Sequence, residues 1–344
     1  MSQGAADRFE HPLIQRYAGQ EMAALFSPRS RVEAWRDLWI ALAEAEAQLG
    51  LGVTEAQVAA LRAKKSEIDF ARVAELERSL RHDVMAHVHH YGEVVPEARA
   101  ILHLGATSCF VTDNGDLVLY RKALELVEGR LCDAMQALAD FARAHRGLPC
   151  LGDTHYLVAQ PVTVGKRAAL WLQDLVLDLD EIRRLIDWLP FRGVKGTTGT
   201  QASFLTLCGG DHRKVEELDR RVCAAMGFAK SFTVSWQTYT RKVDWTLHSA
   251  LSGIAQSSSK FAADIRLLSH DGELEEPSES KQIGSSAMAY KKNPMRCERI
   301  AALVAQEGLP MPSLTASLGS AAQHSTRRSE AELRERADRA LYQA

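Results

Sequence analysis

The chain has 344 residues, of which 46% are hydrophobic and 25% charged, and its formal net charge is −2. This length is enough for a sizeable core and about two domains of ordinary size. The near-neutral charge gives no electrostatic argument for nucleic acid or an anionic membrane as a partner. The N-terminus lacks an apolar targeting core, and no apolar run approaches the roughly 20 residues that span a bilayer. We therefore expect a cytoplasmic protein.

Six cysteines are scattered along the chain, and none forms a Cys-x-x-Cys pair. Zinc-binding domains and disulfide frameworks carry closely spaced or paired cysteines. The sequence therefore predicts neither a structural zinc site nor a disulfide-stabilised fold.

Apolar residues repeat at three- and four-residue spacing in several segments, which is the pattern of amphipathic helices. The spacing predicts six helices, over about 30–49, 55–64, 68–91, 116–145, 162–189 and 241–268. No strand pattern of comparable strength is present. Three of these helices are long enough for an elongated bundle, so we predict an all-α fold with a smaller N-terminal helical domain. We expect domain boundaries at 1–107, 108–306 and 307–344.

Two charged motifs lie in the N-terminal part of the chain. Arg16-Tyr17 is typical of a surface pair on its residues alone. Arg81-His82-Asp83 is followed by His87 and His90, and Asp83, His87 and His90 share one helical face at spacings of four and three. A metal site is one interpretation of that face, although a closed site needs a fourth ligand that nothing here supplies.

Hydroxyl and glycine residues gather at three further places. Thr107-Ser108 offers two hydroxyls to a carboxylate and equally suits a helix N-cap. His155 lies in a break in the helical pattern over 146–161, where a solvated histidine is the ordinary case. Residues 191–203 look like a phosphate cradle but do not fit the nucleotide-triphosphate loop pattern.

The segment 278–295 has the strongest functional pattern in the chain. Its centre, Gly284-Ser285-Ser286-Ala287, predicts a polar loop whose backbone amides are free to point at a ligand. Lys291 and Asn293 follow within reach of an anion held there. On the residues alone, Ser285 and Ser286 are equivalent candidates.

The string Gly-Ser-Ser-x-Met-x-x-Lys-x-Asn in this segment resembles the signature of the fumarase/aspartase superfamily, and residues 289–296 resemble its adenylosuccinate lyase branch. The likeness covers about residues 10–306. It implies elimination of fumarate from adenylosuccinate and from the related succinyl-carboxamide ribotide in purine nucleotide synthesis. It also implies that no metal or organic cofactor is needed. A homotetramer, with each site built from several subunits, is the implied assembly.

The resemblance also assigns roles to individual residues. It implies that Ser285 is the catalytic base, that His155 is the acid and that His82 assists catalysis. The residues that it implies bind substrate are Arg16, Tyr17, Arg81, Asp83, Thr107, Ser108, Gln237, Lys291, Asn293 and Arg299. A serine acts as a base only where its alkoxide is stabilised, and loop amides and Lys291 offer that field.

The chain departs from the family pattern in four places. Leu157 and Val158 stand where Gln and Pro are usual, Trp236 replaces a small residue and is expected to crowd Gln237, and Ala289 replaces a Pro. The family's C-terminal domain has no counterpart after about residue 306. Three alternatives therefore stay open: another fumarate-releasing lyase such as argininosuccinate lyase, a shortened and weakly active lyase-like subunit that acts through oligomerisation, or a metal-binding helical protein.

Overall fold

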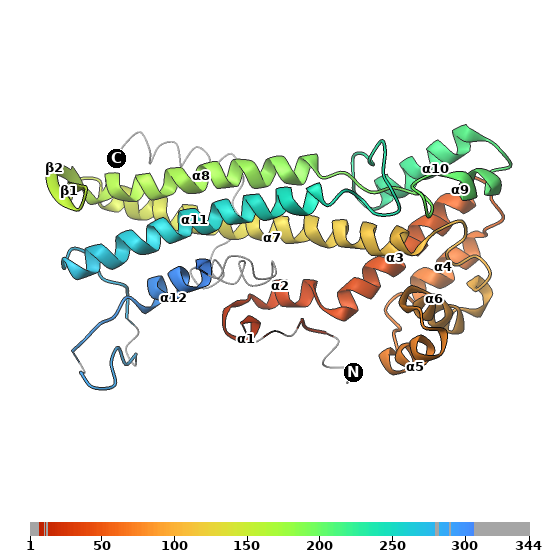
Figure 1. Cartoon of the computed structure of the whole chain (residues 1–344), viewed down its shortest axis with the longest axis horizontal. Helices are drawn as coiled ribbons and strands as arrows, with labels where there is room; N and C mark the ends of the chain where they lie inside the picture. Colours follow the sequence, from red (N-terminus) through yellow and green to blue (C-terminus); the bar gives the residue numbers. More distant parts are fainter. Residues whose placement is uncertain (1–6, 10, 12, 279–281, 289, 306–344) are drawn as a thin grey trace. The chain divides into compact units, whose positions relative to one another are not determined.

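A computed structural model describes residues 7–9, 11, 13–278, 282–288 and 290–305, and these residues are mainly helical (Figure 1). The helices are α1 (Ile14–Tyr17), α2 (Gln20–Leu25), α3 (Pro28–Gln48), α4 (Glu55–Ala63), α5 (Phe70–Leu80), α6 (Asp83–Val94), the 3₁₀ helix η2 (Pro96–Ala98), α7 (Ser108–Ala144), α8 (Val164–Trp188), α9 (Ala202–Leu207), α10 (His212–Ala225), α11 (Lys242–His270) and α12 (Met295–Val304). The all-α prediction is confirmed. The predicted C-terminal segment 307–344 lies outside the described residues.

The chain divides into two compact units. The first unit consists of Met1–His11, Gln20–Leu124 and Ile186–Asp244, and the second of Pro12–Gly19, Glu125–Leu185 and Trp245–Ala344. The long helices α7, α8 and α11 therefore each contribute residues to both units. No described helix combines the length and the apolar character that crossing a membrane requires.

Helix α3 is the central helix of the first unit. Ser27 caps its N-terminus by accepting a hydrogen bond from Ser30 N at 3.1 Å. Its buried side chains include Trp35, Leu38 and Trp39, and the helix packs against α4 and α10. Apolar residues at this spacing form a stripe that must be covered, which explains why α3 is buried along most of its length.

The predicted single helix over 68–91 is wrong, because the chain breaks it into α5 and α6. Arg81 adopts a left-handed backbone with φ 52° and ends α5, and the His82 side chain caps α6 by accepting from Met85 N at 3.3 Å. A left-handed arginine is unfavourable by about 1 kcal/mol. No hydrophobic pattern announces such a break, since apolar residues continue on both sides of it.

Helices α7, α8 and α11 run side by side in the second unit (Figure 1). Their shared core contains Ala142, Ala168, Trp171 and Leu268. Trp171 satisfies its indole N–H by donating to Asp264 Oδ2 at 2.8 Å, as a buried tryptophan usually must. The long-helix bundle predicted from the apolar spacing is present in this unit.

A β-hairpin replaces the predicted irregular break over 146–161. Its strands, β1 (Pro149–Thr154) and β2 (Leu157–Thr163), pair antiparallel with a bulge between Gly152 and Asp153. The two residues of the turn, His155 and Tyr156, both have positive φ, at 53° and 61°. This is the backbone of a two-residue hairpin turn whose twist matches that of the strands. The turn places His155 at the tip of the hairpin.

Candidate active site

His82 and Ser108 meet in the first unit although 26 residues separate them. The start of α6 carries His82 and the start of α7 carries Ser108, and His82 Nε2 lies 3.4 Å from Ser108 Oγ. His82 Nδ1 accepts from the backbone N–H of Met85, so a neutral ring carries its proton on Nε2. That proton points at the serine hydroxyl. The cap of α6 therefore fixes both the orientation and the tautomer of His82.

Gln237 reaches the same place from a distant loop. Its Nε2 lies 3.5 Å from Thr107 Oγ1, across 130 residues of sequence, and Thr107 is itself buried. Thr107, Ser108 and Gln237 thus present hydroxyl and amide groups together at the N-terminus of α7. Amides and hydroxyls are groups that hydrogen-bond carboxylate and purine edges.

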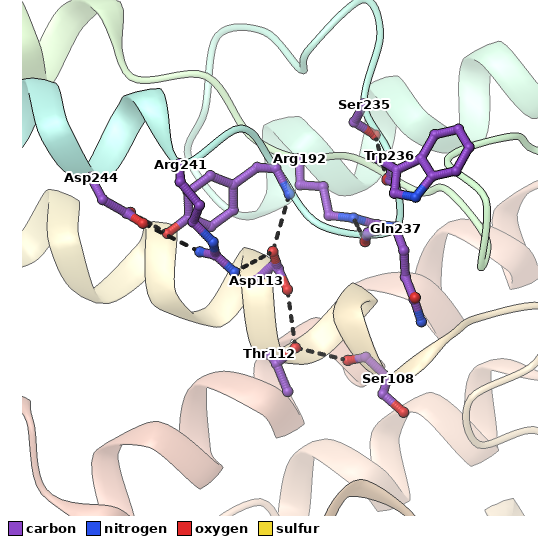
Figure 2. Close-up of polar contacts among 10 residues, drawn as sticks. Ser108, Thr112, Asp113, Arg192, Ser235, Trp236, Gln237, Arg241 and Asp244 are labelled. Atoms are coloured by element: carbon purple, nitrogen blue, oxygen red, sulfur yellow. Dashed lines mark hydrogen bonds and ion pairs between the residues drawn. The ribbon is translucent and has the colours of Figure 1, made fainter.

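The Arg192 side chain reaches the backbone of Gln237 (Figure 2). Its side chain is fully buried, and its Nε donates to Gln237 O at 2.7 Å. The other guanidinium nitrogens donate to Lys195 O at 2.9 Å, Gly196 O at 3.1 Å and Gly193 O at 3.4 Å. Burial lowers the pKa of this arginine from its usual value. Four backbone carbonyls from two loops therefore converge on one cation.

Asp113 ties the 237–241 loop to the first turns of α7 (Figure 2). Its carboxylate is 3% exposed and accepts from Tyr239 N at 3.1 Å and from Thr112 Oγ1 at 3.2 Å. The Arg241 guanidinium lies 3.6 Å away. The partners that a buried carboxylate requires are all present.

Asn114, the next residue, ties α7 to the 191–196 loop. Its Nδ2 donates to Gly193 O and its Oδ1 accepts from Gly193 N, both at 3.2 Å. The same Nδ2 also donates to Phe110 O at 2.9 Å. Gly193 has φ +90°, and an added Cβ would come within 2.5 Å of Asp219, so only glycine fits this approach.

Trp236 does not crowd Gln237, contrary to the sequence expectation. The indole is 71% exposed and points away from the Gln237 side chain (Figure 2).

Arg81 and Asp83 flank His82 and are both exposed. Asp83 lies 3.5 Å from His82 Nδ1. Neither residue joins the cluster of Thr107, Ser108 and Gln237 through a described contact. Their roles in binding substrate stay predictions.

The histidine face of α6 serves packing. Each ring nitrogen of His90 faces a donor, with Arg36 at 3.1 Å and Asp69 N at 3.2 Å. His87 packs edge-on against Trp35, and burial lowers its pKa to about 4. Asp83 is exposed at the end of the helix. Because both ring nitrogens of His90 already face protein groups, this face is a poor fit for the metal-binding alternative.

A cavity of about 560 Å³ lies elsewhere in the first unit, near His90 and the start of α5. Its polar groups are already in use, since Asp69 caps α5, Glu67 pairs with Lys64 and Arg29 pairs with Asp7. None of the predicted site residues lines it. It therefore adds no candidate site.

Three predicted substrate residues gather in the second unit. The Arg299 guanidinium, on α12, lies 5.5 Å from the centre of the Tyr17 ring on α1. Arg16 is the exposed neighbour of Tyr17. Stacking of an arginine over tyrosine leaves the guanidinium edge free for a phosphate or carboxylate.

The signature loop of the second unit folds back on itself. Ser285 Oγ accepts from Ala287 N at 3.3 Å and Met288 N at 3.2 Å, and Asn293 Nδ2 donates to Gly284 O at 2.9 Å. A Cβ on Gly284 would lie 2.2 Å from Lys291 O, so the closure needs glycine. Lys291 is exposed, and Ala289 lies outside the described residues.

His155 is exposed at its hairpin tip, beside a run of apolar side chains. Tyr156, Leu157 and Val158 are 84%, 72% and 63% exposed. The substituted positions Leu157 and Val158 start the second strand and pair with Thr154 and Asp153, next to the bulge between Gly152 and Asp153.

Arg192, Asp113 and Asn114 also lie at this site, although the sequence pattern did not mark them as candidates. Arg192 precedes the glycine-rich turn, and Asp113-Asn114 follows Thr107-Ser108 closely, which was the only available signal. Charged residues are mostly solvated, so their burial is visible only in the structure.

Comparisons with known proteins agree on one family. A family model described as "Lyase" matches residues 16–306. The chain is 50% identical over 305 residues to the adenylosuccinate lyase of Saccharomyces cerevisiae, covering 88% of this chain and 63% of that protein. It is 50% identical over 295 residues to the adenylosuccinate lyase of Schizosaccharomyces pombe, covering 85% and 61%. The chain thus spans less than two thirds of the length of these relatives.

A solved structure with a related fold is the 3-carboxy-cis,cis-muconate lactonizing enzyme from Pseudomonas putida. It superposes with a TM-score of 0.73 at 27% identity, over 96% of this chain and 72% of that one. The helical architecture is therefore shared well beyond the residues of the signature loop.

Proposed function

This chain belongs to the lyase family whose model it matches over residues 16–306, and we propose that it eliminates fumarate from adenylosuccinate. The observation that carries the proposal is the 50% identity, over most of the chain, to relatives named adenylosuccinate lyase. The fumarase/aspartase resemblance of the signature segments is confirmed at the level of the family. The related succinyl-carboxamide ribotide is a second proposed substrate.

The proposed elimination needs a base, stabilisation of charge and an acid. The base removes a proton from the carbon next to a carboxylate, donors hold the resulting aci-carboxylate, and the acid protonates the leaving nitrogen. We assign the base to Ser285 and the acid to His155. The C–N bond breaks as the C=C bond of fumarate forms.

The signature loop offers groups that would stabilise a Ser285 alkoxide. Two backbone N–H groups already point at its Oγ, from Ala287 and Met288. An oxygen that accepts two N–H bonds carries negative charge more readily. Lys291 would add positive charge, and Asn293 would keep the loop closed through Gly284.

The cluster in the first unit is suited to binding substrate. Gln237, Thr107 and Ser108 would hydrogen-bond the substrate, with His82 placing a proton at Ser108. Arg81 and Asp83 would extend this cluster, and Arg16, Tyr17 and Arg299 of the second unit would hold the phosphate. Arginine suits that role because its planar fork binds two phosphate oxygens.

A homotetramer with sites shared between subunits is part of the proposal. Large apolar side chains are exposed on the helices of the second unit, with Leu170 and Leu177 on α8 and Leu267 on α11 at 47%, 62% and 42%. Further copies of the chain would cover this surface. All six cysteines are free, which fits a reducing compartment such as the cytoplasm.

The proposal is tested by following the ultraviolet absorbance of adenylosuccinate mixed with the purified protein. Turnover that disappears in a Ser285→Ala variant supports the proposal. A folded, helical sample that gives no turnover with adenylosuccinate rejects it. Argininosuccinate serves as the comparison substrate, and preference for it would move the activity to another lyase of the family.

A further inference from the structure

We propose that Arg192 and Asp113 are positioning residues, which hold the Gln237 side chain in register with Thr107 and Ser108 for substrate binding. This inference rests on the proposed function, because Gln237 matters only if that site binds substrate. Both residues lie in the first unit, and neither has a free polar edge directed at the cluster in the described contacts.

Arg192 holds Gln237 through the backbone carbonyl of Gln237. Arg192 Nε donates to Gln237 O at 2.7 Å, which is the shortest of the four bonds from this guanidinium to carbonyls. A short, charge-assisted bond fixes the peptide plane that carries the Gln237 side chain. The same cation also gathers the carbonyls of the 193–196 turn, so the two loops share one anchor.

Asp113 holds the 237–241 loop at a second point, two residues after Gln237. Tyr239 N donates to Asp113 at 3.1 Å, and Asp113 also faces Arg241 at 3.6 Å. The segment from Gln237 to Tyr239 is thereby fixed at both ends, once from the 191–196 loop and once from α7. Both bonds lie on the C-terminal side of the Gln237 Cα and fix the peptide that follows it, which limits how far the Gln237 side chain can shift along the loop.

Asn114 fixes the loop that carries Arg192 to helix α7. Its Nδ2 donates to Gly193 O, and its Oδ1 accepts from Gly193 N. Helix α7, the 191–196 loop and the 237–241 loop are therefore joined in pairs. Thr107 and Ser108 lie at the start of the same helix. Gln237 and these two hydroxyl residues are therefore all held by the same three connected segments.

The use of a buried arginine to join these segments favours a role in positioning Gln237. Burying a charged residue is costly, and apolar replacements of buried ion pairs are often as stable or more stable. Stability alone would therefore not favour a buried arginine at 0% exposure among carbonyl groups. What the planar guanidinium provides is several directed bonds from one rigid group.

The test is a double-mutant cycle that measures kcat/KM with adenylosuccinate. We expect Arg192→Lys to lower kcat/KM on the order of 10- to 100-fold, because small misplacements of binding groups have effects of this size. In a Gln237→Ala background the same substitution should change kcat/KM by less than about 3-fold, since its effect passes through Gln237. Asp113→Asn gives a second, independent cycle with the same expectation.

Arg36→Lys is the matched control. Arg36 is equally buried and donates to the carbonyls of Lys64, Lys65 and Glu67. Its other contacts within the described residues are with His90 and Tyr91, which are not proposed site residues. Its effect on kcat/KM should be the same with Gln237 and without it. If Arg192→Lys behaves as Arg36→Lys does, with equal losses in both backgrounds, the positioning role is overturned and Arg192 is only structural.

A measurement on the unaltered protein covers the case in which the variants fail to fold. Hydrogen exchange should show the Tyr239 amide strongly protected, because Asp113 accepts its N–H in a buried setting. Exchange at the rate of an open loop would overturn the proposal. Absence of turnover in the unaltered protein would instead reject the proposed function, and this inference with it.

Discussion

In the first unit, buried polar groups hold the candidate substrate side chains, whereas in the second unit the signature loop is held by bonds within its own turn. Arg192, Asn114 and Asp113 are 0%, 0% and 3% exposed. In the signature loop, Ile283 and Tyr290 are 78% and 83% exposed, and the hydrogen bonds of the Ser285 hydroxyl within the described residues are to the neighbouring amides of Ala287 and Met288.

The two regions are held in different ways: by bonds between distant segments in the first unit, and by bonds within one turn in the signature loop. Buried hydrogen bonds that join several segments restrict one another's movement. The side chains of Thr107, Ser108 and Gln237 are therefore held in a fixed arrangement. Four changes would test this comparison.

Ser285→Ala should have the largest effect on activity. We expect kcat to fall about 10³-fold or more, because removal of a base leaves no group to take the proton. The melting temperature should stay within about 2 °C, since the side chain bonds only two amides of its own turn. Absorbance assays and thermal unfolding measure the two. An equal loss in Ser286→Ala would show that the wrong serine was assigned.

Asn114→Ala should have the largest effect on stability. It removes bonds to Phe110 and to both polar groups of Gly193 in a fully buried place, and we expect a loss of about 2–4 kcal/mol. The paired change, Asn293→Ala, removes one bond to Gly284 in the signature loop and should cost about 1 kcal/mol or less. Urea unfolding of both variants measures the contrast. Equal losses would contradict the difference between the two regions.

Glu46→Gln should stabilise the protein in a pH-dependent way. Both carboxyl oxygens of Glu46 are buried and have no hydrogen-bond partner among the described residues, and burial raises the pKa of Glu46 to about 8. Between about pH 4.5 and 8 the folded state keeps a proton that the unfolded state has lost, so stability falls as pH rises through this window. We expect Glu46→Gln to gain about 1–3 kcal/mol at pH 8 and little at pH 5.

Urea unfolding of the unaltered protein and of the Glu46→Gln variant at both pH values checks this. A gain of the same size at pH 5 and pH 8 would show that Glu46 does not titrate in the window. The result compares two buried ionisable residues: Arg192, which has hydrogen-bond partners, and Glu46, whose carboxyl oxygens have none among the described residues.

Trp236→Ala should have the smallest effect. The indole is exposed and points away from Gln237, so we expect kcat/KM to change less than about 2-fold, as for other surface substitutions. The same absorbance assay measures it. A loss of 10-fold or more would mean that Trp236 contacts substrate or a neighbouring copy at the site.

The long helices and the family could be predicted from the sequence alone. Apolar residues at helical spacing bury one face of a helix in any fold, so the ranges near 30–49, 116–145 and 241–268 were readable locally. Helix α7 begins at Ser108, eight residues before its predicted start, because the polar residues around Asp113 and Asn114 interrupt the apolar pattern while remaining helical. Their side chains are buried by distant loops, which local spacing does not show.

Only the tertiary structure decided how the candidate site is assembled. The break at Arg81 and His82 depends on a left-handed residue and a capping side chain, and the hairpin depends on two positive φ angles at His155 and Tyr156. The contact of Gln237 with Thr107 and the burial of Arg192 join segments that are 130 and 45 residues apart. A charged residue in a sequence is ordinarily solvated, and it becomes a buried anchor only where distant backbone groups converge to replace water.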